Sequence, residues 1–146
     1  MKARKNLNCM SILILVLSAF TLVRVLVETF VFDFNMETLP EGATAGLVLA
    51  TQISLCVFSC ILLLPQIYVG VKGMKLAKNP VNNFKAPIVW ATILAVISAI
   101  SLFSPISGLI NAKDIVSNLV ALLNLATDVA VYIAYIVYAK QVLKAE

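Results

Sequence analysis

The stretch TAGLVLATQISLCVFSCILLLPQIYVGV, residues 44–71, decides the fold because it runs for 28 residues without a charged side chain. An α-helix rises 1.5 Å per residue, so about 20 apolar residues cross the hydrocarbon core of a bilayer, which is about 30 Å thick. The stretch is long enough to cross a membrane as one helix. It therefore predicts a transmembrane segment.

Three further apolar stretches divide the remainder of the chain, and the predicted spans are residues 10–32, 44–71, 87–110 and 115–139. The segments between them, 33–42, 72–85 and 111–114, contain turn-forming residues such as Pro40, Gly73 and Asn111. The sequence thus predicts an all-α integral membrane protein. We expect one membrane domain over residues 1–146, an antiparallel bundle of four transmembrane helices.

The composition excludes a water-soluble monomer and several kinds of enzyme. Hydrophobic residues make up 62% of the chain and charged residues only 12%, whereas soluble proteins carry about 25% charged residues. Histidine is absent, which excludes a Ser-His-Asp triad, a histidine general base and any histidine-containing metal site. We expect no catalytic residues, no metal site, no cofactor and no enzyme activity.

The distribution of cations predicts the orientation, because short loops rich in Lys and Arg stay on the cytoplasmic side. Nine of the eleven cations precede the first span, follow the last or lie between the second and third: Lys2, Arg4, Lys5, Lys72, Lys75, Lys78, Lys85, Lys140 and Lys144. Both termini are therefore expected in the cytoplasm and the chain in the cell membrane. Four aromatic residues near the cytoplasmic helix ends are predicted interfacial anchors: Tyr68, Trp90, Tyr135 and Tyr138.

A cleaved signal peptide ending at Ala43-Thr44-Ala45 is the alternative interpretation of the first span. The apolar run is longer than the usual signal-peptide core and contains Arg24 and Glu28, so we expect an uncleaved anchor.

Lys72, Lys75 and Lys78 share one side of the segment that follows the second span if it is helical. Each lysine at an anionic membrane surface gains about 1 kcal/mol, so this segment predicts lipid headgroup contact. Orientation alone explains these cations, and no aromatic platform accompanies them, so no nucleic-acid partner is expected.

Polar residues inside the spans are the candidate functional cluster: Arg24, Glu28, Gln52, Asn124 and Asp128. An ionisable residue at the centre of a span costs about 2.5–3.5 kcal/mol and needs a partner. Arg24 and Asp128 differ in predicted depth by about 5 Å, so contact between the first and fourth spans is within reach. The cluster is either a proton-exchanging transport site or polar contacts that only determine which helices touch.

Two spans carry a face suited to close helix packing. The second has Gln52, Cys56, Ser59, Leu63, Gln66, Gly70 and Gly73 at alternating steps of four and three. The third has a stripe of small residues, Ala91, Ala95, Ser98, Ser101, Ser104 and Gly108. We expect both faces to serve helix association, with a solute path as the alternative. The thiols of Cys56 and Cys60 are expected to pack as small apolar groups.

Pro65 and Pro105 interrupt the hydrogen-bond ladders of the second and third spans and are candidate hinges. The pair Pro65-Gln66 resembles the signature of PQ-loop transporters, in which the proline is a hinge of a three-helix bundle. The resemblance covers these two residues, and it implies only that transport stays open as a function.

The segment GVKGMKLAKNP, residues 70–80, and the following APIVW, residues 86–90, resemble small uncharacterised four-span membrane proteins of Gram-positive bacteria. This resemblance covers the second half of the chain. It implies a bacterial inner-membrane location and no particular activity, substrate or site.

Three functions remain open at this stage. The first is an accessory or interaction subunit that acts through helix association, either as a homo-oligomer or with another membrane protein. The alternative is a small proton-linked transporter, exporter or holin-like pore that uses Arg24, Glu28 and Asp128. An intramembrane enzyme is the least supported, because no nucleophile and base are identifiable.

Overall fold

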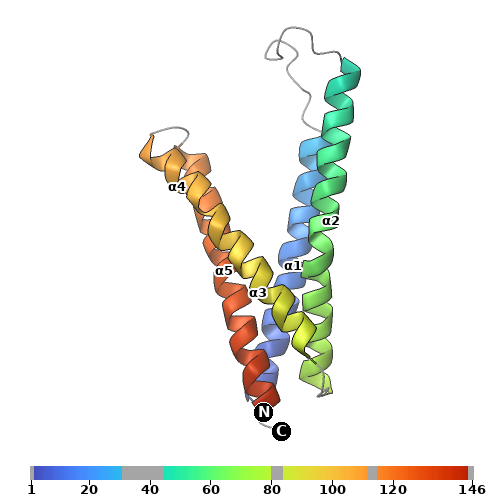
Figure 1. The fold of residues 1–146 in the computed structure, drawn as a ribbon, viewed down its shortest axis with the longest axis vertical. Coiled ribbons are helices and arrows are strands. Elements are labelled where there is room, and N and C mark those ends of the chain that lie inside the picture. The colour runs from blue at the N-terminus through green and yellow to red at the C-terminus, as the bar shows by residue number, and fades with distance from the viewer. Residues whose placement is uncertain (1, 31–44, 80–83, 112–114, 145–146) are drawn as a thin grey trace. The chain divides into compact units, whose positions relative to one another are not determined.

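The structure is a computed structural model that describes residues 2–30, 45–79, 84–111 and 115–144 (Figure 1). Five helices make up this part of the chain: α1 (Lys2–Phe30), α2 (Ala45–Lys78), α3 (Lys85–Ser101), α4 (Phe103–Ile110) and α5 (Ile115–Lys144). The predicted all-α class is confirmed. The side chains of residues 28–30, 45 and 55 lie outside the description.

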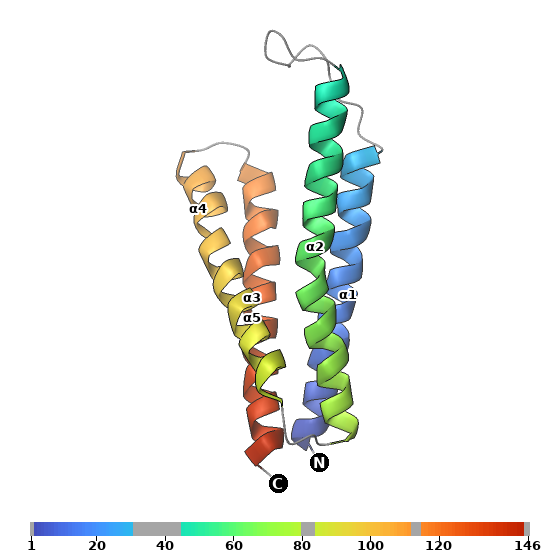
Figure 2. The ribbon, with the colours of Figure 1, turned by 45° about the vertical axis from the view of Figure 1, so that its right-hand side comes forward.

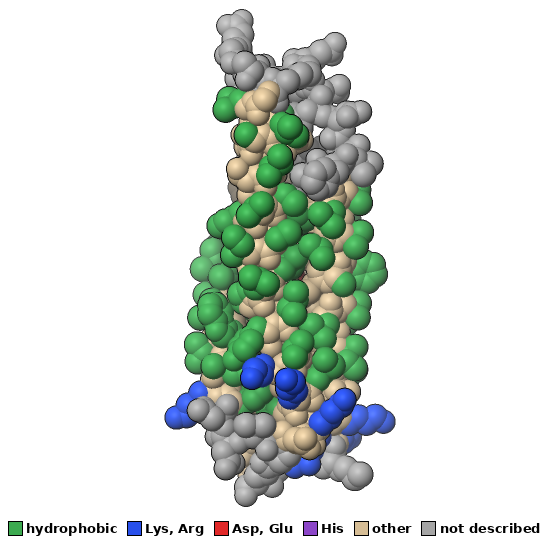
Figure 3. Space-filling model, turned by 90° about the vertical axis from the view of Figure 1, so that its right-hand side faces the viewer, with side chains coloured by type: hydrophobic (Ala, Val, Ile, Leu, Met, Phe, Trp, Pro, Cys, Tyr) green, Lys and Arg blue, Asp and Glu red, His purple; other side chains and the backbone are tan. Residues whose placement is uncertain are grey.

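Four segments are long and apolar enough to cross a membrane: Lys2–Val27, Gly46–Lys78, Lys85–Ile110 and Ile115–Lys144. They match the four predicted spans in number and order. Large apolar side chains remain exposed along them, among them Phe20 (70% exposed), Phe103 (74%) and Ile110 (78%). On the face drawn in Figure 3, hydrophobic side chains cover most of the described atoms, and Lys and Arg gather toward one end. A lipid environment suits such a surface, whereas water does not.

The second helix extends beyond its predicted end at residue 71. Residues 72–78 were predicted to belong to a loop, but they continue α2, and Gly73 is buried inside the helix. One glycine costs a helix only about 1 kcal/mol, which is too little to end it. The helix ends just before Pro80, where the Asn79 amide donates to the Lys75 carbonyl at 2.8 Å.

The third span is divided into α3 and α4 at Leu102, three residues before Pro105. A proline has no amide hydrogen to donate, and its ring crowds the carbonyl four residues earlier, which here belongs to Ser101. The Leu102 amide donates to Ala99 at 3.3 Å, and the Ile106 amide donates to Leu102 at 3.3 Å. Proline chemistry therefore explains the position of this break.

The chain forms two compact units, each described by itself. Unit 1 comprises residues 1–15 and 65–146, and unit 2 comprises residues 16–64. Both units draw on α1 and α2, because the boundaries fall within these helices. In α2 the boundary lies between Leu64 and Pro65.

Within unit 1, α3 and α4 pack along α5, and Figures 1 and 2 both show this arrangement. The buried side chains of α3 and α4 include Ala91, Leu94 and Pro105. Gly108 allows a close approach, because a Cβ built on it would overlap the amide of Asn118 on α5. Small residues of the predicted stripe thus bring α3 and α4 close to α5.

Among the described side chains of unit 2, Ser18, Cys56 and Leu63 are buried. The exposed hydroxyls of Thr21, Thr51 and Ser54 donate to carbonyls four residues earlier in their own helices, at 2.8–3.0 Å. These hydroxyls are therefore satisfied locally, as a helix in lipid requires.

Candidate functional site

The residues of the predicted polar cluster are divided between the two units. Arg24 and Gln52 belong to unit 2, whereas Asn124 and Asp128 belong to unit 1. Arg24 and Asn124 are exposed, and Gln52 and Asp128 are half-buried. The side chain of Glu28 lies outside the described residues. A contact between Arg24 and Asp128 remains a prediction.

Asp128 lies on the inner side of α5. Residues on the same side of the helix are buried: Tyr132 is 4% exposed, and Tyr135 and Ala139 are fully buried. Tyr132 follows Asp128 by four residues, so the two side chains are neighbours on one helix face. Asp128 itself is half-buried and lies on the face of α5 that is covered further along the helix.

Tyr135 connects α5 to α2 in the core of unit 1. Its hydroxyl donates a hydrogen bond to the Val69 carbonyl at 3.0 Å, and the side chain is 0% exposed. The prediction that Tyr135 is an interfacial anchor is therefore wrong. A phenol buried among apolar groups needs a hydrogen-bond partner, and a backbone carbonyl supplies it here.

Gly73 makes room for this contact. A Cβ built on Gly73 would overlap the ring of Tyr135 and the Oγ of Ser11 on α1. A helical side chain covers the turn that precedes it, so a larger residue at 73 would also cover the carbonyl of Val69. The absence of a side chain at Gly73 exposes that carbonyl to the tyrosine.

Ser11 and Gly70 extend the same contact toward α1. Ser11 is fully buried, and its hydroxyl donates to the Leu7 carbonyl at 2.7 Å. A Cβ on Gly70 would lie 2.7 Å from Leu15 Cγ and 3.2 Å from the Ser11 carbonyl oxygen. We call Ser11, Gly70, Gly73 and Tyr135 the three-helix contact, because they join α1, α2 and α5.

The predicted packing face of α2 is the inner face of this helix. Its seven residues are buried or half-buried: Gln52, Cys56, Ser59, Leu63, Gln66, Gly70 and Gly73. The spacing of these residues indicated which side of the helix would be covered. It did not indicate that Tyr135 would lie against Gly73, because that depends on the register of a helix distant in sequence.

The lysines of the predicted headgroup contact lie in α2. Lys72, Lys75 and Lys78 are all exposed, whereas Leu76 between them is fully buried. The Lys72 Nζ lies 5.8 Å from the centre of the Tyr68 ring, within the range of a cation–π interaction. The three cations therefore share the outer side of the helix, and their contact with lipid headgroups remains a prediction.

The two candidate hinges differ in their local structure. Pro65 lies inside the uninterrupted helix α2, at the boundary between unit 2 and unit 1. Pro105 is buried in α4, just after the break at Leu102. Motion at either proline remains a prediction.

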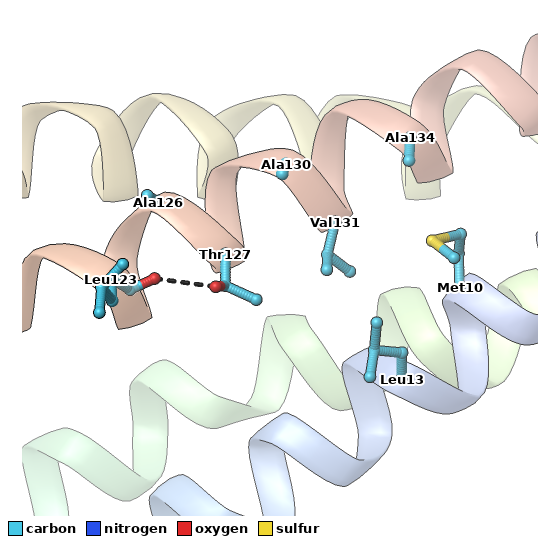
Figure 4. Close-up of a pocket in the computed structure, with 8 residues that line it drawn as sticks. All are labelled: Met10, Leu13, Leu123, Ala126, Thr127, Ala130, Val131 and Ala134. Atoms are coloured by element: carbon cyan, nitrogen blue, oxygen red, sulfur yellow. Dashed lines mark hydrogen bonds between the residues drawn. The ribbon is translucent and has the colours of Figure 1, made fainter. Parts of the chain in front are cut away.

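An apolar groove lies between α1 and α5 within unit 1 (Figure 4). It has a volume of about 490 Å³ and is open to the surface. Met10 and Leu13 line it from α1, and the α5 lining is Leu123, Ala126, Thr127, Ala130, Val131 and Ala134. The sequence gives no sign of this groove, because residues of two helices distant in sequence are needed to form it.

Metal-ligating and thiol groups form no further site in the part of the chain that is described. No three Cys, Asp or Glu side chains lie close enough there to hold a metal ion. Cys9, Cys56 and Cys60 are free thiols, with Cys56 buried and Cys60 half-buried.

Comparisons with protein-family models, with curated proteins and with solved structures gave no match for this chain. The function of the chain is therefore inferred from its own residues.

The three-helix contact predicts that Gly73 tolerates no side chain. We expect Gly73→Ala to lower the free energy of unfolding by about 1–3 kcal/mol, because the added methyl group overlaps Tyr135 and Ser11. Gly46→Ala is the matched control, since a Cβ there meets nothing within 4 Å. Thermal unfolding in detergent, followed by circular dichroism, compares the two. Equal stability of the two variants would contradict this account of the contact.

The buried hydrogen bond predicts a smaller effect for Tyr135→Phe. Removing the hydroxyl leaves the ring in place and costs one interhelical hydrogen bond, about 0.6–2 kcal/mol. Tyr138→Phe, at a half-buried position one turn later, is the control. The same unfolding measurement should show a lower midpoint for Tyr135→Phe only, and an unchanged midpoint would argue against the bond.

Proposed function

We propose that this chain is a multi-pass protein of the bacterial inner membrane that acts through helix association with a second copy or another membrane protein. Four apolar helices and the gathering of cations near the chain ends and the second loop support a membrane protein with both termini in the cytoplasm. The resemblance of residues 70–90 to small four-span proteins of Gram-positive bacteria supports the location.

The observation that carries this proposal is a pair of small polar residues on the outer side of the α3–α4 junction. Ser101 and Ser104 are exposed, and the neighbouring Ile100 and Phe103 are 62% and 74% exposed. Small side chains between large ones leave a notch that lets another helix backbone approach closely. We call Ser101 and Ser104 the serine notch.

The serine notch is the part of the predicted small stripe that is exposed among the described residues. Ala91 is buried, and Ala95, Ser98 and Gly108 are half-buried, in the hairpin that α3 and α4 form with α5. The Ser101 hydroxyl donates to the Ile97 carbonyl at 2.9 Å, so the hydroxyl hydrogen already has a partner within the helix. The oxygen still accepts hydrogen bonds, which favours a polar group on a partner helix.

The polar groups of unit 1 favour association over transport. The hydroxyls of Ser11, Thr92, Ser101 and Thr127 donate to carbonyls of their own helices, and that of Tyr135 donates to Val69. The groove between α1 and α5 is lined almost entirely by hydrocarbon. A path for a charged or polar solute needs polar groups directed into it.

Asp128 supports a small proton-linked transporter as the second candidate. It is an acid on the inner side of a membrane-spanning helix, next to buried Tyr132. Intramembrane carboxyl groups in such positions often exchange protons during transport. Arg24 and Glu28 would complete that site.

The serine notch predicts the outcome of an association experiment. We expect the double variant Ser101→Leu/Ser104→Leu to weaken association at least threefold, because leucine fills the notch and removes the hydroxyls. Thr92→Leu, at an exposed hydroxyl elsewhere on α3, should leave association unchanged. Energy transfer between labelled chains in lipid vesicles detects a second copy, and photocrosslinking at residue 104 in cells detects another protein. Absence of both signals in the unmodified protein would contradict the proposal.

A flux measurement separates the two candidate functions. Under the proposed function, the protein in vesicles with an imposed pH gradient carries no proton flux that depends on added cationic solutes. Asp128→Asn should then change only assembly or thermal stability. A solute-dependent flux that disappears in Asp128→Asn would instead establish transport and place its site at this acid.

A further inference from the structure

The groove between α1 and α5 is an elongated apolar hollow. Its α5 lining runs from Leu123 to Ala134, which is a rise of about 16 Å along the helix. The groove is open to the surface, so an apolar chain can enter it from the side.

The lining chemistry selects a hydrocarbon ligand. Seven of the eight side chains are aliphatic or, for Met10, a thioether. The exception is Thr127, whose hydroxyl donates to the Leu123 carbonyl of its own helix at 2.8 Å, as Figure 4 shows. The length of the groove is about half the thickness of a 30 Å hydrocarbon core.

Cations lie beyond the groove, toward the end of unit 1 that holds Lys2 and Lys144. Residues 2–15 of α1 carry Lys2, Arg4 and Lys5 and no acid, and residues 134–144 of α5 carry Lys140 and Lys144 and no acid. Helical periodicity places Gln141 on the row that lines the groove and Lys144 beside that row. Lys2 precedes Leu13 by eleven residues, about three turns, and so lies on the same side of α1 as this lining residue. Both lysines are exposed.

We propose that the groove holds one acyl chain of an anionic phospholipid, whose phosphate lies near Lys2 and Lys144. The length of the groove suits part of one acyl chain, and its aliphatic lining favours hydrocarbon. The positive charge beyond the groove favours an anionic headgroup over a zwitterionic one. The proposal depends on the membrane location and not on the serine notch, which lies on other helices.

Native mass spectrometry of the full chain tests this site. The protein is reconstituted in equal amounts of phosphatidylglycerol and phosphatidylcholine and then released into detergent. We expect one retained phosphatidylglycerol per chain. Ala130→Phe fills the groove at an exposed position and should reduce that retention at least tenfold, whereas Ala99→Phe, at an exposed position on α3, should retain the lipid.

A second pair of variants tests the headgroup. Lys2→Gln/Lys144→Gln should keep a bound lipid but lose the preference for phosphatidylglycerol by about fivefold per lysine. Lys72→Gln/Lys75→Gln removes the same charge from the outer side of α2 and should keep the preference.

Three results would overturn the proposal. One is equal retention of both lipids by the unmodified protein, and another is undiminished retention by Ala130→Phe. The third is a dimer in the spectrum that Ala130→Phe abolishes, which would assign the groove to a second copy. Should Ala130→Phe fail to fold, Ala126→Leu fills the same groove with a smaller side chain and is judged by the same criteria.

Discussion

The close approach of Tyr135 to Gly73 is the contact on which the packing of unit 1 depends. Three helices meet there, because Tyr135 belongs to α5, Gly73 to α2 and the neighbouring Ser11 to α1. A lipid environment supplies no hydrophobic force between helices, so association requires close backbone approach and interhelical hydrogen bonds. The contact supplies both: two glycines permit the approach, and the tyrosine hydroxyl reaches the Val69 carbonyl. The α3–α4–α5 hairpin uses the same principle at Gly108.

Composition and length were enough to predict the helices but not their contacts. Four uncharged or nearly uncharged stretches identified all four candidate spans, because one apolar segment satisfies its own backbone groups in lipid as a helix. The sequence suggests a turn at Gly73, but the structure places this residue inside α2. Glycine lowers helix stability only slightly, whereas at this position it has a large effect on tertiary packing. A tyrosine near a helix end can be an interfacial anchor or a buried hydrogen-bond donor, so the sequence alone does not identify the role of Tyr135. Only the register between α5 and α2 shows that it is buried.

The candidate site shows the same division between local and long-range information. Depth along a helix follows from residue number, so Arg24 and Asp128 could be compared in depth from sequence alone. Whether a side chain is covered or exposed depends on which side of its helix packs against other helices. Asp128 lies on the same side of α5 as Tyr132, Tyr135 and Ala139, which the structure shows to be covered. The stripe of small residues in the third span likewise follows from the spacing of residues within one helix. Its members separate into buried and exposed groups, and the exposed ones lie next to the break that Pro105 causes at Leu102.

Helix α5 illustrates how one apolar helix presents different chemistry on its different sides. Its inner side carries the acid and the two buried tyrosines, and the groove is lined by three alanines, Leu123, Val131 and one locally satisfied threonine. Val131 borders the inner side, but Ala130 lies far from it, because residues 130 and 132 differ by about 200° at 3.6 residues per turn. A substitution at Ala130 therefore leaves Asp128 and Tyr135 in place, and a substitution at Asp128 leaves the groove open. Lipid binding, helix association and any proton exchange thus depend on separate residues, which makes each of them accessible to mutation without the others.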